Sequence, residues 1–233
     1  MERANSSMTE ILARADNLYS RRADMDCVIE CVRLLKSVEI GEFEIAWRLG
    51  RAWFFMGQEA RDCSESRKNY QLGIKASERA VSLKDERVEG HFWLGVNLAL
   101  LAAERNVIAG ARLALRARRA LLRAVAIDAG FHGAGPLRVL AKLEQKLPKV
   151  LGGGIERSRG HFDQAIQIAP ANTVTRIYYA ELLLKLGEHA SVKRQLEAVL
   201  NSPDDAFWQF EIDRDKRLAR EMLEGDSRLK VRK

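Results

Sequence analysis

The chain has 233 residues, of which 47% are hydrophobic and 30% are charged, and its formal net charge is +7. This composition is typical of a globular protein and excludes fibrous and disordered classes. A chain of this length can bury a core without disulfides or a structural metal. No stretch approaches the roughly 18 apolar residues of a membrane helix, and no hydrophobic segment of a secretory signal follows the N-terminal charges.

Apolar residues recur every three or four positions along almost the whole chain, and no segment alternates as a strand would. Glycines and prolines divide this pattern into about ten to twelve helices, so the sequence predicts an all-α protein. Residues 228–233 are basic and are expected to fray. The predicted helices are 9–22, 24–38, 42–56, 64–83, 86–104 and 109–127, then a helix that opens at Gly133–Pro136 and ends before Pro148, followed by 155–168, 174–186, 189–200 and 206–223.

A short pattern repeats along these helices. Leu49-Gly50 and Leu94-Gly95 each precede a second helix with small and large residues at fixed spacing. The pattern predicts a tetratricopeptide-like α-α solenoid of about four helical hairpins, with extra N-terminal helices and a C-terminal capping helix. We expect an N-terminal helical pair at 1–40, repeats at 41–203, and a capping helix with a basic tail at 204–233, all within one compact domain. The early repeats are longer than the standard repeat of about 34 residues.

Aromatic residues gather on the first helices of three of these hairpins. In a solenoid those helices line the concave surface, so the aromatic set indicates an apolar groove for a small ligand or a partner peptide. Ordinary packing between repeats is the alternative interpretation. The candidate groove residues are Trp47, Trp53, Phe92, Tyr178 and Tyr179.

The segment 105–143 is strongly basic, and four of its arginines form one helical stripe because they follow an i, i+4, i+7, i+11 spacing. Such a stripe can attract an acidic partner, an anionic lipid or a phosphate backbone; the alternative is a solvated face neutralised by glutamates of neighbouring helices. The absence of interleaved aromatics argues against nucleic acid. The stripe consists of Arg112, Arg116, Arg119 and Arg123.

No catalytic constellation, cofactor motif or metal-ligand spacing is present, so we expect a non-enzymatic protein with no cofactor and no metal. Cys27 and Cys31 share one helical face. They are interpreted either as a redox or metal pair or as two small buried apolar residues.

The segment His132-Gly133-Ala134-Gly135-Pro136-Leu137-Arg138-Val139-Leu140 precedes Pro148, a glycine-rich turn and two further repeats. In this order it resembles the T component of tripartite ATP-independent periplasmic (TRAP) transporters, over roughly residues 42–200. Gly133, Gly135 and Pro136 are expected to form a structural loop. A second similarity, carried by the segment 47–52, is to eukaryotic regulators of microtubule dynamics with elongated tetratricopeptide units.

The transporter resemblance implies a scaffold without catalysis. It implies a homotrimer, association with a substrate-binding protein, and a cavity for a small apolar or carboxylate ligand. Two alternatives stay open: a cytoplasmic adaptor that binds a peptide in its concave groove, and a binder of anionic membrane surfaces through the arginine stripe. The sequence as given indicates the cytoplasm, and the periplasm if a leader was removed.

Overall fold

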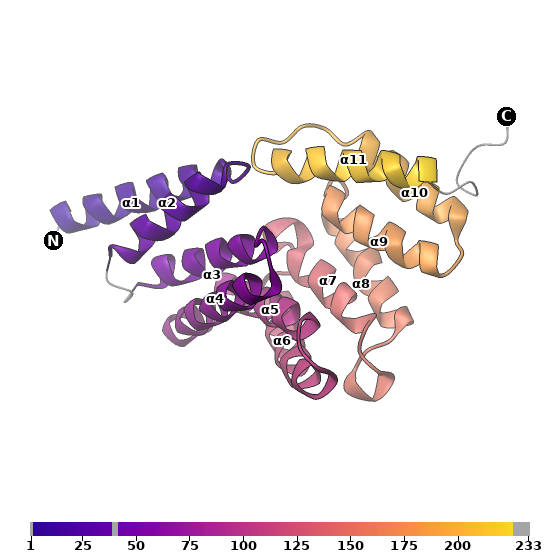
Figure 1. Cartoon of the computed structure of the whole chain (residues 1–233), viewed down its shortest axis with the longest axis horizontal. Coiled ribbons are helices and arrows are strands. Elements are labelled where there is room, and N and C mark those ends of the chain that lie inside the picture. Colours follow the sequence, from indigo (N-terminus) through magenta and orange to yellow (C-terminus); the bar gives the residue numbers. More distant parts are fainter. Residues whose placement is uncertain (1, 39–41, 226–233) are drawn as a thin grey trace. The chain divides into compact units, whose positions relative to one another are not determined.

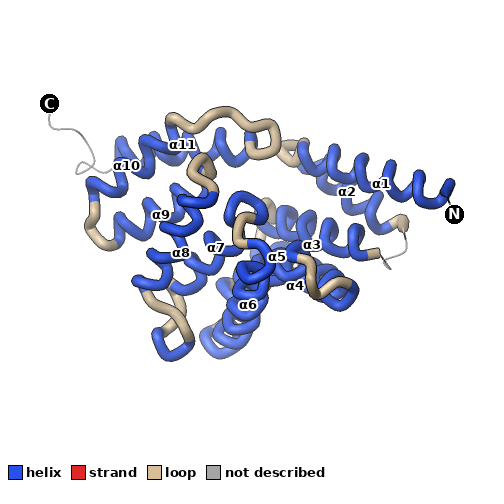
Figure 2. Tube along the Cα trace, turned by 180° about the vertical axis from the view of Figure 1, so that it is seen from behind, coloured by secondary structure: helices blue, strands red, loops and turns tan. Residues whose placement is uncertain are grey.

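The computed structural model describes residues 2–38 and 42–225, and all regular structure in these ranges is helical (Figures 1 and 2). The chain forms two compact units, Met1–Asp128 and Ala129–Lys233. The all-α prediction is confirmed. The predicted junction at residues 40–41 and the predicted basic tail at 228–233 lie outside the described residues. The predicted domain boundaries stay a prediction.

The described residues of the N-terminal unit form six helices, and each packs against the next along the chain. α3 also contacts α1 and α5. Side-chain caps mark two of the starts, since Asp24 accepts from the Asp26 amide and Asp62 accepts from the amides of Ser64 and Glu65. The helices are α1 (Glu2–Ser20), α2 (Met25–Lys36), α3 (Phe43–Gln58), α4 (Cys63–Leu83), α5 (Val88–Ala103) and α6 (Val107–Asp128).

Small residues set the distance between neighbouring helices of this unit. A Cβ atom added to Gly50 of α3 would collide with the Ser77 hydroxyl of α4. One added to Gly95 of α5 would lie 2.6 Å from Leu121 Cγ of α6. The Leu-Gly pattern in the sequence therefore marks two places where consecutive helices approach closely.

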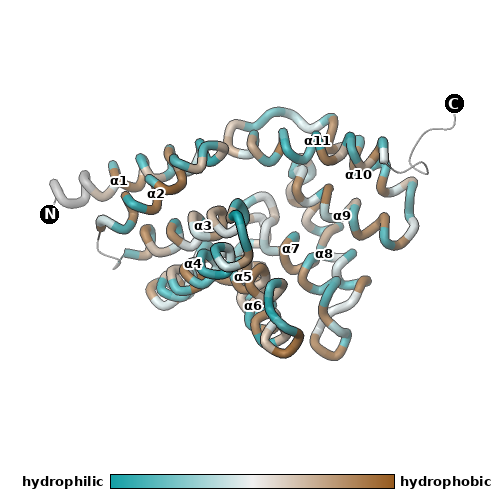
Figure 3. Tube along the Cα trace, in the orientation of Figure 1, coloured by the Kyte–Doolittle hydropathy of each residue, from teal (hydrophilic) through white to brown (hydrophobic). Residues whose placement is uncertain are grey.

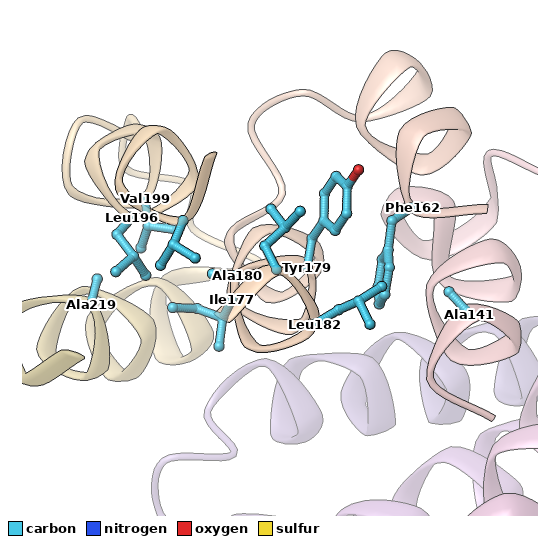
Figure 4. Close-up of a cluster of buried hydrophobic side chains, with 11 residues drawn as sticks. Ala141, Phe162, Ile177, Tyr179, Ala180, Leu182, Leu196, Val199 and Ala219 are labelled. Atoms are coloured by element: carbon cyan, nitrogen blue, oxygen red, sulfur yellow. The ribbon is translucent and has the colours of Figure 1, made fainter. Parts of the chain in front are cut away.

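In the C-terminal unit α7 packs on α8, α9 packs on α10, and α11 contacts both α9 and α10. Figure 4 shows the core of this unit, where Ile177 and Ala180 of α9 lie near Leu196 and Val199 of α10. The elements are α7 (Phe131–Glu144), a 3₁₀ turn (Lys149–Leu151), α8 (Ile155–Ile168), α9 (Thr173–Lys185), α10 (His189–Leu200) and α11 (Gln209–Gly225).

Most predicted helices agree with the structure to within a few residues. The largest difference is at α1, which begins at Glu2 where the sequence predicted Thr9. The segment Asn5-Ser6-Ser7 has no apolar periodicity to indicate a helix. At the other end, residues 206–208 form a turn, so the last helix begins at Gln209 where the prediction had 206.

Candidate functional site

A groove of about 370 Å³ lies between α2 and α3 in the N-terminal unit. Its volume is in the range of small-molecule sites. Trp53, one of the aromatic residues predicted to line a groove, is half-buried there. The full lining is Ile29, Val32, Arg33, Lys36, Ser37, Trp53 and Met56.

The groove combines two kinds of side chain. Ile29, Val32 and Met56 join the Trp53 indole to form its apolar part. Two basic residues, Arg33 and Lys36, belong to the last turn of α2, where positive charge is favoured by the helix dipole. An apolar surface with cationic groups beside it suits a small molecule that has an apolar body and an anionic head.

The other predicted groove residues in the N-terminal unit lie elsewhere. The Trp47 indole NH donates to Glu44 Oε2 at 2.9 Å, and its ring centroid lies 4.3 Å from the Arg48 guanidinium carbon. Phe92 is buried in edge contact with Trp93. Trp53 is thus the predicted aromatic residue that lines the α2–α3 groove.

Tyr178 and Tyr179 belong to the C-terminal unit. The buried Tyr179 ring stacks on Phe162 with centroids 5.2 Å apart, and its hydroxyl donates to Asp163 at 2.7 Å. Burial and the neighbouring Asp163 carboxylate raise the pKa of Tyr179 to about 12. The half-buried Tyr178 ring lies 4.5 Å from Lys142 Nζ. Binding through either tyrosine stays a prediction.

All four stripe arginines are exposed on α6. Arg116 forms an ion pair with Glu78 at 2.6 Å, and Arg123 forms one with Asp85 at 3.2 Å. In the described part of the chain, no ion pair is recorded for Arg112 or Arg119 within 4 Å. The stripe is therefore half neutralised by acids from α4 and the turn that follows it.

The predicted glycine loop has an unusual backbone. His132, Gly133 and Ala134 are all left-handed, with φ of 52°, 61° and 57°. Right-handed geometry resumes after them, so Pro136 lies in the first turn of the regular part of α7, where its missing N–H costs little. A Cβ added to Gly133 would lie 2.7 Å from Asn172 Nδ2. Two left-handed residues that are not glycine indicate a segment held by its surroundings.

Arg138 is the side chain that holds this turn. Its Nη1 atom donates to the Gly133 carbonyl at 2.9 Å, to Asn172 Oδ1 at 3.1 Å and to Thr175 Oγ1 at 3.2 Å. Asn172 is also the N-cap of α9. Because the guanidinium is desolvated by burial, the pKa of Arg138 falls to about 10. One arginine thus connects the left-handed turn to the start of α9.

A second buried cluster connects α1 to α3. The Asp16 carboxylate accepts from Arg48 Nη2 at 2.8 Å and from Arg51 Nη2 at 2.7 Å. The Arg51 guanidinium carbon lies 3.9 Å from the centre of the Tyr19 ring. Burial alone would raise the pKa of Asp16, but the two arginines outweigh it, and the pKa lies below its ordinary value. Sequence reasoning missed this cluster and the Arg138 contacts.

The cysteines are free thiols. Cys31 is buried, its thiol donates to the Ala15 carbonyl at 3.4 Å, and burial raises its pKa to about 11. Within the described ranges, no group of three or more His, Cys, Asp or Glu side chains is placed to hold a metal. Over the same residues, no helix is both long enough and apolar enough to cross a membrane.

Comparison with known families gives a match that covers most of the chain. The family model described as the TRAP transporter T-component matches residues 54–229. No curated protein matches the chain. The match includes the left-handed turn and Arg138, whereas all the groove residues except Met56 precede it. The chain belongs to the TRAP transporter T-component family.

Proposed function

We propose that this T component is a non-enzymatic scaffold that associates with itself and with a substrate-binding protein, and that it holds a small apolar carboxylate in the α2–α3 groove. Family membership supports the association with transporter partners. The observation that supports a bound ligand is the groove itself, where Trp53 lies with Arg33 and Lys36.

The proposal includes a tetratricopeptide-like arrangement of the helices. Two close approaches, Gly50 against Ser77 and Gly95 against Leu121, support it because they join the first and second helices of the predicted hairpins. A stack of such hairpins leaves long surfaces for other proteins. A homotrimer is the assembly that the family resemblance implies.

The ligand class follows from the groove's side chains. The apolar residues would cover a short aliphatic or aromatic body, which accounts for most of the binding free energy at such sites. The carboxylate would form charge-assisted hydrogen bonds with the arginine or lysine. Arg33 is exposed, and its acidic neighbour Glu30 is 3.9 Å away, so its guanidinium can approach a ligand.

Calorimetry with decanoate and decanol separates the two parts of the ligand. We expect decanoate to bind the full chain more tightly than decanol by about tenfold, since one charge-assisted contact contributes about 1.5–3 kcal/mol before solvent screening. Replacing both basic residues, Arg33→Gln with Lys36→Gln, should reduce decanoate to the affinity of decanol. Equal affinities for the two probes in the unsubstituted chain would refute a carboxylate site.

Trp53→Ala tests the apolar part, with Trp47→Ala as its matched control. Both substitutions remove a half-buried indole from α3, but only Trp53 lines the groove. Decanoate binding should be lost in the first variant and kept in the second. Native mass spectrometry of the unsubstituted chain tests self-association; a trimer is the expected mass, and a monomer that binds peptides would instead favour the adaptor.

A further inference from the structure

An ordinary surface helix buries its large apolar residues. On α6, by contrast, several large apolar residues are exposed and most of the buried residues are small. Its buried face is rich in alanine, at Ala114, Ala117, Ala120 and Ala124, together with Leu121. Leu113, Val125 and Ile127 are half-buried, and the other four large aliphatic residues of α6 are exposed. Their exposed fractions are 88% for Val107, 73% for Ile108, 40% for Leu115 and 38% for Leu122.

These exposed residues form a line. Ile108, Leu115 and Leu122 are seven residues apart, so they follow one another along one side of the helix. Figure 3 shows hydrophobic colouring at the end of α6 that joins α5, which is where Val107 and Ile108 lie. Val107 and Ile108 are largely exposed to water, and Leu115 and Leu122 are about two-fifths exposed, which is unfavourable for such side chains.

Positive charge borders this line. Arg112 and Arg119 follow Ile108 and Leu115 by four residues and are exposed on the adjacent strip of α6. Arg116 and Arg123 are one position further round and are used in ion pairs with Glu78 and Asp85. α6 contains no acidic residue before Asp128. The exposed face is therefore apolar along its middle and cationic at its edge.

The spacing distinguishes a membrane surface from a partner helix. A helix–helix seam needs two apolar residues per heptad, but the positions three and four residues after Leu115 are Arg118 and Arg119. A lipid surface needs only protruding aliphatic side chains and cations that reach the headgroups. Val107 and Ile108 are the two most exposed aliphatic residues of this face and lie at the start of the helix.

We propose that this face of α6, defined by Val107, Ile108, Leu115, Leu122, Arg112 and Arg119, binds anionic phospholipid, with the aliphatic side chains entering the interface and the two arginines contacting headgroup phosphates. The inference is independent of the groove ligand. Trp53→Ala should bind vesicles as the unsubstituted chain does, so failure of the groove proposal would leave it standing.

Vesicle sedimentation of the full chain tests the proposal. The chain should sediment with phosphatidylglycerol–phosphatidylethanolamine vesicles at low salt, less at high salt, and not with phosphatidylcholine alone. Arg112→Glu with Arg119→Glu should weaken binding at least about tenfold, given the contribution of each cation near an anionic surface. Ile108→Ser should weaken it with no change in net charge, because it removes only an aliphatic side chain.

The control is Arg217→Glu with Arg220→Glu, two exposed arginines of α11 whose replacement changes the net charge equally. It should sediment nearly as the unsubstituted chain does, and circular dichroism should show all variants helical. The proposal is overturned if the α6 double variant binds as tightly as the control or if the unsubstituted chain ignores anionic vesicles. It is also overturned if the α6 variant changes only the oligomeric mass, since that would make the face a contact between copies.

Discussion

Two arginines, one in each unit, are buried to a similar extent but satisfied in different ways. The Arg51 side chain is 7% exposed and contacts the Asp16 carboxylate, as does its neighbour Arg48. Arg138 is 5% exposed, and the acceptors of its hydrogen bonds are a carbonyl, an amide and a hydroxyl. Burial disfavours a charged guanidinium at both places.

The consequence appears in the direction in which the pKa of each arginine is shifted. Burial lowers the pKa of both Arg48 and Arg138, but hydrogen bonds from Arg48 to Asp16 reverse the shift, and its pKa ends above the ordinary value. The N-terminal cluster therefore joins α1 to α3 through charge. The C-terminal cluster connects the turn at 132–134 to the start of α9 through three hydrogen bonds from one nitrogen atom, Nη1 of Arg138.

Arg138→Met gives the largest expected effect. It removes the three hydrogen bonds that Arg138 donates, which should cost about 3 kcal/mol of unfolding free energy, although Asn172 Oδ1 still accepts from the Thr175 amide and hydroxyl. Urea unfolding followed by circular dichroism measures this. Arg138→Lys should recover less than half of the loss, because its Nζ atom lies one bond nearer the backbone than Nη1 and falls short of the three acceptors. A loss below about 1 kcal/mol in the methionine variant would show that the turn does not depend on Arg138.

Asp16→Asn should cost less, about 1–2 kcal/mol. The variant leaves two buried arginines without their carboxylate, which is costly in a fully buried pair. Here the Asp16 side chain is 40% exposed, so water screens part of the loss. Urea unfolding again measures the difference. A loss as large as that of Arg138→Met would mean that charge and geometry contribute equally.

The same pair has a pH dependence of known sign. Because the folded-state pKa of Asp16 lies below its ordinary value of 3.8, its ionised form stabilises the fold at pH values above that figure. The stabilisation is lost as the pH falls through the lower, folded-state pKa. The stability difference between the unsubstituted chain and Asp16→Asn should therefore shrink below about pH 4. A difference that stays constant down to pH 2 would contradict the ion-pair account.

Arg116→Gln should have the smallest effect on stability. It provides an exposed ion pair to compare with the two buried arginines. Arg116 and Glu78 are both about half exposed, and such pairs contribute about 0.5 kcal/mol or less. Thermal unfolding at low and high salt should show a small difference that salt removes. A loss of more than about 1 kcal/mol of unfolding free energy would mean that this exposed pair stabilises the fold as much as a buried one does.

The sequence was a good guide to the helices because periodicity and breakers act locally. Pro170 and Gly187 separate α8, α9 and α10 where predicted, and the arginine stripe lies on one exposed strip of α6 as its spacing indicated. Each Leu-Gly pair lies where two consecutive helices come close, which only a small residue permits.

The buried clusters were beyond sequence reasoning for a physical reason. Asp16 and Arg48 are 32 positions apart, and Arg138 and Asn172 are 34 apart, so their pairing depends on how helices cross and not on local pattern. Nothing in Ala134 indicates a left-handed residue, since alanine normally avoids that conformation. The aromatic set was read as one surface, but side-chain direction within each helix places Trp53 in the groove and Phe92 in the core.

The arrangement of α6 also has an evolutionary consequence. Its alanines lie where α5 comes close, with Ala117 and Ala124 completely buried, so a larger side chain there would force the two helices apart. Its exposed leucines carry no such constraint from the fold. Along this helix, we expect the buried small residues to vary little in related sequences. The exposed large residues should vary unless a binding partner constrains them.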